Sequence, residues 1–119
     1  MEWELDKKRA ICPQIEEKIS IMIASGVYQP SEKLPSVREV AVLAGINPNT
    51  VQKAFTQLET KGLIYSVRGS GWFVSEDNSM AKNTLEEMIA LKTSQFFTEM
   101  RLLGCSDDLI KQTVKEWNK

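Results

Sequence analysis

The stretch "GINPNTVQKAF", residues 45–55, sets a glycine, two asparagines and a proline directly against residues with helical apolar spacing. Gly45 permits a tight break after an earlier helix, because glycine adopts backbone conformations that other residues avoid. Asn47 can cap the next helix, and Pro48 fits its first position, where no backbone N–H is needed. The stretch therefore predicts a helix that starts at Asn47 and stops at Gly62. Its expected buried face consists of Val51, Ala54, Phe55 and Leu58.

The preceding residues, "LPSVREVAVLAG", predict a short helix with its own start signal. Ser36 and Glu39 have the spacing of a capping box, in which each side chain satisfies a backbone N–H of the other residue. The apolar stripe is expected at Val37, Val40 and Ala41, together with either Leu43 or Ala44. Two helices joined by a short turn that contains glycine match the helix-turn-helix motif, whose second helix inserts its N-terminal residues into the DNA major groove.

Two β-rich runs follow this pair of helices, "LIYSV" and "WFV", on either side of "RGSG". The runs predict a hairpin, because the turn holds two glycines that can take positive φ. A hairpin that carries Arg68 directly after a helix-turn-helix is the order of a winged helix domain. The tip of such a wing can reach phosphates or the minor groove.

Another helix is predicted ahead of these elements, over "PQIEEKISIMIASG". Pro13 suits its first turn and Gly26 suits its stop. Its apolar face is expected to hold Ile11, Ile15, Ile19, Met22 and Ile23.

The tail begins with the polar segment "SEDNSMAKN", which lacks periodicity and predicts a linker. Thr84 and Glu87 resemble a second capping box, at the start of a helix that runs to Leu103. Gly104 is expected to break that helix. The apolar residues on one side of it are Leu85, Met88, Ile89, Phe96, Met100 and Leu103.

Ser106 is expected to cap a last helix, whose stripe contains Leu109, Ile110, Val114 and Trp117. Two such amphipathic helices need a surface that covers them. They can pack on the winged domain of the same subunit or form a symmetric dimer interface, and the dimer is the favoured alternative. The predicted fold is therefore mainly α with a small β-hairpin. Residues 1–75 are expected to form a winged helix-turn-helix DNA-binding domain, and residues 76–119 a linker and a two-helix dimerisation region.

The composition of the 119 residues argues against catalysis. The chain has no histidine, the commonest general base and metal ligand, so no enzymatic activity, cofactor or metal site is expected. Cys12 and Cys105 lie far apart without disulfide or metal-binding spacing and are expected to be buried or idle thiols. No apolar run approaches the length of a membrane span and no signal-peptide pattern is found, so a cytoplasmic protein is expected.

The charge of the chain is unevenly distributed, although its formal net charge is only −1. Residues 33–75 carry five basic and two acidic side chains, a net +3, whereas residues 1–32 and 76–119 each carry −2. A positive middle permits a polyanion partner. Ordinary surface charge explains the same asymmetry.

The segment "LPSVREVAVLAGINPNTVQKAFTQLETKGLIYSVRGSGWFV" closely resembles the DNA-binding domain of GntR-type transcription regulators, and the match covers Pro13–Val74. The pairing of "NPNTVQKAF" with a short tail is similar to the YtrA subfamily, whose C-terminal region is two dimerisation helices without a large ligand-binding domain. The resemblance implies a homodimeric regulator, usually a repressor and often of transporter operons. The chain departs from the family pattern at "QPSEK" and in the wing, where Ser70 and Trp72 replace a lysine and a smaller residue.

The residues predicted to contact DNA are Ser36, Arg38, Asn47, Asn49, Thr50, Gln52, Lys53, Arg68, Gly69 and Ser70. Arg38 can bind guanine O6 and N7 bidentately, and the resemblance implies base readout by this arginine. A solvated or glutamate-paired arginine is the alternative. Gln52 can pair with adenine and Lys53 can touch phosphate, although both can equally be exposed helix surface.

Asn49 and Thr50 fall in the first turn of the predicted recognition helix, where a helix N-terminus attracts phosphate, and helix capping is their alternative role. Arg68, Gly69 and Ser70 would contact the groove or the DNA backbone, or form a plain hairpin turn. A rival to DNA binding is a winged helix used for protein contacts through an exposed Trp72 and the tail. A small-molecule effector is compatible with a dimer crevice, because the tail is too short to enclose a large pocket.

Overall fold

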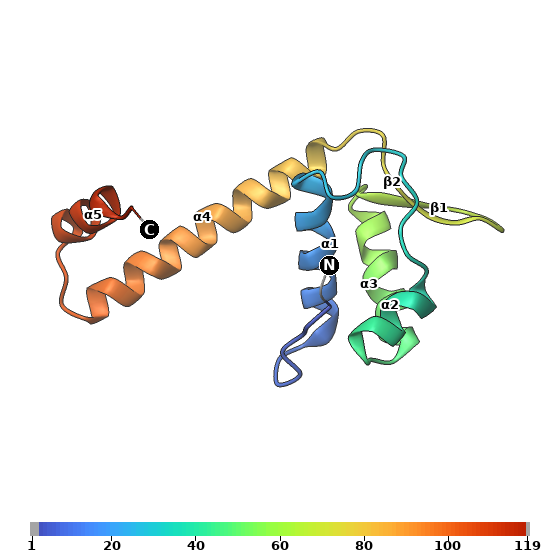
Figure 1. Cartoon of the computed structure of the whole chain (residues 1–119), viewed down its shortest axis with the longest axis horizontal. Coiled ribbons are helices and arrows are strands. Elements are labelled where there is room, and N and C mark those ends of the chain that lie inside the picture. The colour runs from blue at the N-terminus through green and yellow to red at the C-terminus, as the bar shows by residue number, and fades with distance from the viewer. Residues whose placement is uncertain (1–2, 119) are drawn as a thin grey trace. The chain divides into compact units, whose positions relative to one another are not determined.

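The computed structural model describes residues 3–118, which fold mainly as helices with one β-hairpin (Figure 1). The elements are α1 (Ile11–Ala24), α2 (Val37–Ala44), α3 (Pro48–Thr60), β1 (Ile64–Val67), β2 (Gly71–Val74), α4 (Ser79–Leu102) and α5 (Asp107–Glu116). The predicted fold class, a winged helix-turn-helix followed by two further helices, is confirmed. The chain forms two compact units that divide between Leu85 and Glu86.

The core of the first unit lies between α1, α3 and the root of the hairpin, and α1 and α3 run side by side (Figure 1). The predicted buried face of α3 is confirmed, since all four of its apolar residues are fully buried. In α1 the helix begins at Ile11, two residues before Pro13, and Ile11 lies half-buried at the rim of the core. The core residues in these helices are Ile15, Ile19, Met22, Ile23, Val51, Ala54, Phe55 and Leu58, and Trp3 from the N-terminal segment joins them.

Local capping fixes the start of α2 and α3, as the sequence predicts. The Ser36 hydroxyl accepts the Glu39 N–H at 3.0 Å, and the Glu39 carboxylate accepts the Ser36 N–H at 3.1 Å. Gly45 ends α2 in the left-handed conformation with φ 67°, and the Asn47 side chain accepts the Asn49 N–H at 2.8 Å. The choice left open at the end of α2 falls on Ala44, which is buried, whereas Leu43 is 62% exposed.

The hairpin gains a third, edge segment from the residues before α2. Strands β1 and β2 pair antiparallel, and Lys33 forms an isolated bridge with Phe73 on the other edge of β2. The Leu34 N–H donates to the Trp72 carbonyl at 2.8 Å, and the Val74 N–H donates to the Glu32 carbonyl at 2.9 Å. The wing is therefore tied to the segment that leads into α2.

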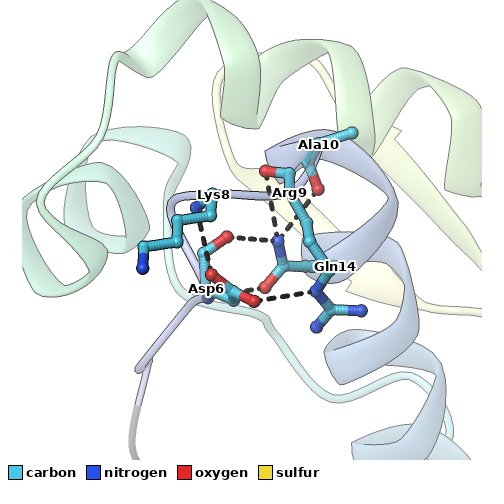
Figure 2. Close-up of polar contacts among 5 residues, drawn as sticks. All are labelled: Asp6, Lys8, Arg9, Ala10 and Gln14. Atoms are coloured by element: carbon cyan, nitrogen blue, oxygen red, sulfur yellow. Dashed lines mark hydrogen bonds and ion pairs between the residues drawn. The ribbon is translucent and has the colours of Figure 1, made fainter.

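The residues ahead of α1 form a hydrogen-bonded hook centred on Asp6 and Gln14 (Figure 2). The Asp6 N–H donates to Gln14 Oε1 at 2.8 Å, and Gln14 Nε2 donates to the carbonyls of Asp6 and Ala10 at 2.8 and 2.9 Å. The Asp6 carboxylate accepts the Lys8 N–H at 3.0 Å and pairs with Arg9 Nε at 3.1 Å. The hook fixes the chain at the N-terminal end of α1 without a side-chain cap on that helix.

The linker predicted over residues 75–83 is wrong in its second half, because α4 already begins at Ser79. Asp77 accepts the Ser79 N–H at 2.9 Å and so supports the first turn. Thr84 lies inside the helix and donates its hydroxyl to the Met80 carbonyl at 2.9 Å, so it is not the predicted cap. The helix starts early because Ala81 is buried in the core of the first unit, and this packing selects helix for a polar segment.

In the second unit the predicted break and cap are both found. Gly104 has φ 91° after α4, and the Ser106 hydroxyl accepts the Leu109 N–H at 3.1 Å at the start of α5. Arg101 joins the two helices through a bidentate ion pair with Asp107, with Nε–Oδ1 at 2.8 Å and Nη2–Oδ2 at 3.0 Å. The Arg101 guanidinium also lies 5.5 Å from the centre of the Phe97 ring.

Candidate nucleic-acid interface

The outer side of α3 is a polar surface. Asn49, Gln52 and Lys53 are exposed, and Thr50 is half-buried. Because the Asn47 side chain already caps the helix, Asn49 and Thr50 are not needed for that role. Gln52 Nε2 makes a long hydrogen bond of 3.4 Å to the Thr56 hydroxyl. The first turn of α3 therefore presents donors and acceptors to solvent, at the end of the helix where its dipole is positive.

A shallow concavity of about 330 Å³ lies where the wing meets α2 and α3. Four of the residues predicted to contact DNA line it: Ser36, Arg38, Gln52 and Ser70. Lys33, Leu34, Val37, Glu39, Gly71 and Trp72 complete the lining. The other predicted residues, Asn47, Asn49, Thr50, Lys53, Arg68 and Gly69, lie outside this concavity.

Acidic neighbours do not neutralise the basic residues of this region. Glu39 is held in the capping box, and the Glu59 carboxylate accepts hydrogen bonds from Ser66 N and Oγ at 3.2 and 3.0 Å. Among residues 3–118 none of the following side chains forms an ion pair: Lys33, Arg38, Lys53 and Arg68. The glutamate-paired alternative for Arg38 therefore does not occur in this structure.

One basic residue of the domain has a structural role instead. Lys61 Nζ, just after α3, lies 2.9 Å from Oε1 of Glu16 in α1, and the Glu16 side chain is largely buried. Cys12 Sγ lies 3.7 Å from the other oxygen of Glu16. Burial and the neighbouring Glu16 carboxylate raise the pKa of the Cys12 thiol, which suits the predicted unreactive thiol. Cys12 and Cys105 are both free and half-buried.

The wing tip is a tight turn that exposes its side chains. Ser70 N–H donates to the Val67 carbonyl at 2.9 Å, and Gly69 takes φ 81°, which favours glycine. Arg68, Gly69 and Ser70 are all exposed. The turn therefore presents one cation and one hydroxyl beside the concavity.

The prediction that Trp72 is exposed for protein contacts is wrong, because this residue is half-buried. Its ring meets the buried ring of Phe55 edge-on, with the centroids 5.5 Å apart. Alternation along β2 turns Trp72 toward α3, where an aromatic wall is available. Trp72 therefore lines the concavity with a ring that is packed on Phe55 of α3.

Sequence reasoning missed two basic residues that the structure places near the helix-turn-helix. Lys33 lines the concavity, and Lys7 Nζ lies 3.5 Å from the Gly45 carbonyl at the turn between α2 and α3. The only signal for Lys33 was its position three residues before Ser36, and the strand pairing that fixes it is a long-range feature.

Across residues 3–118, no group of His, Cys, Asp and Glu side chains could hold a metal ion. No helix in the same range has the length and apolar content that a membrane span requires.

A helix-turn-helix with a hairpin wing and unpaired cations beside its second helix defines a winged helix nucleic-acid-binding protein. The family described as bacterial regulatory proteins, gntR family, matches residues 13–74. The chain belongs to this family of DNA-binding transcription regulators. The matched range is the one predicted from sequence, and the family and its members are transcription regulators, which confirms that the chain is not an enzyme.

The resemblance to YtrA extends over most of the chain. The chain is 36% identical over 110 residues to the HTH-type transcriptional repressor YtrA of Bacillus subtilis (strain 168), covering 89% of this chain and 82% of YtrA. A GntR family transcriptional regulator from Listeria monocytogenes is structurally similar, with a TM-score of 0.83, 34% identity and coverage of 96% of this chain and 100% of that one.

A third similar structure contains DNA. The structure of AraR(DBD) in complex with operator ORX1 has a TM-score of 0.53 and 38% identity, and it covers 54% of this chain and 77% of that one. The similar part of AraR is thus a domain that was crystallised on an operator.

Proposed function

We propose that the chain is a transcriptional repressor that binds a palindromic operator as a homodimer. The observation that carries the proposal is the concavity at the junction of α2, α3 and the wing, where Ser36, Arg38, Gln52 and Ser70 meet. Side chains from the start of α2, from α3 and from the wing converge there beside the polar surface of α3. Such convergence beside a helix N-terminus suits the edge of a DNA groove.

Each predicted residue takes a role that its chemistry and position support. Arg38 is unpaired and reads guanine through its planar fork, and Gln52 pairs with an adenine. Asn49 and Thr50 approach the DNA backbone at the first turn of α3, while Lys53 binds a phosphate.

The wing tip, formed by Arg68, Gly69 and Ser70, reaches the minor groove or its phosphates. Ser36 and Asn47 hold the helix ends at the DNA surface through their caps.

The homodimer is supported by apolar surface on α4, on α5 and in the turn between them. The six residues of the predicted interface, Leu85, Met88, Ile89, Phe96, Met100 and Leu103, are half-buried or exposed in the single chain. An apolar groove of about 300 Å³ is lined by Phe96, Met100, Thr113, Val114 and Trp117. Apolar surface of this extent on so short a tail favours a second copy as its cover. We assign residues 1–75 to DNA binding and residues 76–119 to the linker and dimerisation region.

A C2 dimer would read two half-sites related by the same symmetry, which accounts for the palindrome. We propose repression rather than activation because the similar protein YtrA is described as a transcriptional repressor. A bacterial regulator of this kind acts in the cytoplasm, where the operator is. A small-molecule effector, if this regulator takes one, has the crevice of the dimer available to it.

The test is a selection of duplexes from random-sequence DNA at low salt. The expected result is a palindrome, with half-sites about one helical turn apart or a multiple of it. Binding to the selected duplex should weaken steeply as salt rises, because each neutralised phosphate releases counterions. A selection that returns no preferred duplex would instead support a winged helix that binds proteins, for which Val42 and Leu43 are exposed apolar residues on α2.

A further inference from the structure

Lys33 has a backbone position that is fixed by the wing, although it lies outside the helix-turn-helix. It bridges to Phe73 on the free edge of β2, and the next residue, Leu34, donates its N–H to the Trp72 carbonyl at 2.8 Å. Leu34 is itself buried in the core. Lys33 is thus held between a buried anchor and a paired strand.

The side chain of Lys33 lies across the first residue of β2. A Cβ atom placed on Gly71 would lie only 3.3 Å from Lys33 Cε, so the aliphatic stem packs where glycine leaves room. Gly71 also has φ 121°, which disfavours any other residue there. The end of the stem therefore lies beside Gly71, while Lys33 as a whole remains exposed and lines the concavity.

Positive charge outnumbers negative charge in the concavity around Lys33. Glu39 is the acidic residue in the same concavity, and its carboxylate is engaged by the Ser36 N–H. Arg38 lines the same concavity and adds a second unpaired cation, and Ser70 adds a hydroxyl. Two cations against the one carboxylate of Glu39 leave the concavity with a net positive charge, which suits an anion.

We propose that Lys33 binds a backbone phosphodiester of the operator at the junction between the wing and α3, an inference that rests on the proposed function. Its role differs from that of Arg38, because an ammonium is a compact charge without the fork that reads a base. A phosphate contact positions the protein and carries no sequence information. Lys33 therefore contributes affinity and salt dependence, whereas Arg38 contributes base preference.

The experiment compares binding of the selected operator and of an unrelated duplex by the full-length protein over a range of salt concentrations. Lys33→Met keeps the stem over Gly71 and removes the charge. It should weaken binding to both duplexes by a similar factor and lower the slope of log K against log salt by about one for each Lys33 in contact. Lys33→Arg should retain the slope. Lys111→Met on α5 controls for the loss of one positive charge and should leave the slope unchanged.

Ethylation of single phosphates locates the contact. Ethylation of one particular phosphate should weaken DNA binding by the wild-type protein. Ethylation of the same phosphate should not weaken binding by Lys33→Met any further. If Lys33→Met has the same salt slope and the same ethylation pattern as the wild type, the proposed role of Lys33 is overturned. The proposed function stands in that case, provided that wild-type binding still depends on Arg38. A wild-type protein that binds no duplex would overturn this inference together with the proposed function.

Discussion

The indole ring of Trp72 in β2 meets the ring of Phe55 in α3 edge-on, with the centroids 5.5 Å apart and the planes at 89°. Phe55 is fully buried, so this contact ties the wing to the recognition helix through the core of the domain. The position of the wing tip relative to the polar side of α3 is therefore set by packing as well as by the hairpin itself.

Trp72→Ala is expected to lower the free energy of unfolding by about 1–3 kcal/mol, because a half-buried ring is lost together with an aromatic contact of about 1 kcal/mol. Trp72→Phe should retain most of this stability. Urea unfolding followed by circular dichroism measures both variants. Equal midpoints for wild type and Trp72→Ala would mean that the pair does not stabilise the wing.

Arg38→Ala is expected to weaken operator binding by about 1–3 kcal/mol for each half-site and to relax the preference at one base pair. Arg38→Lys should recover little of that preference, because lysine lacks the planar fork. Competition against operators substituted at single positions provides the measurement. A uniform loss at every position would instead make Arg38 a phosphate contact.

Gly45→Ala is expected to destabilise the domain by about 1–2 kcal/mol, because a residue with Cβ is strained at φ 67°. Gly45→Asn is the matched control, since asparagine tolerates the left-handed region better. Thermal unfolding of the two variants should place asparagine between alanine and glycine. The opposite order would show that the strain is relieved by movement of the turn.

Ile89→Glu should disrupt the proposed homodimer, whereas Leu91→Glu should leave it intact. The two residues are 56% and 59% exposed in the single chain, but their spacing places them on different sides of α4. Light scattering coupled to gel filtration gives the mass of each variant. The predicted interface would be contradicted if Ile89→Glu remained a dimer, or if both variants were monomers.

The ion pair between Arg101 and Asp107 should make the second unit sensitive to acid. The hydrogen bonds from Arg101 lower the pKa of Asp107 below its usual value near 4. Stability from this pair is therefore fully present above about pH 4 and is lost as the pH falls through the lower pKa of the folded state. NMR titration of the Asp107 carboxyl should give a low pKa in the wild type and a higher one in Arg101→Met.

The starts and stops of the helices were predictable because the signals are local. The caps at Ser36, Asn47 and Ser106 each depend on a hydrogen bond between residues two or three positions apart, and Gly45 and Gly104 end helices by their own conformation. The one failure of this kind, the start of α4, came where burial of Ala81 extended the helix into a polar segment.

The order of the elements, the buried face of α3 and the family all follow from the amino-acid pattern, because spacing and caps act within a few residues. Packing of the folded chain, in contrast, places Lys33 along the edge of β2, turns Trp72 inward onto Phe55 and brings four of the predicted residues into one concavity. The pairing of Lys33 with Phe73 and the packing of Trp72 on Phe55 join residues far apart in the chain. Such contacts depend on how whole elements pack, which a local pattern does not encode.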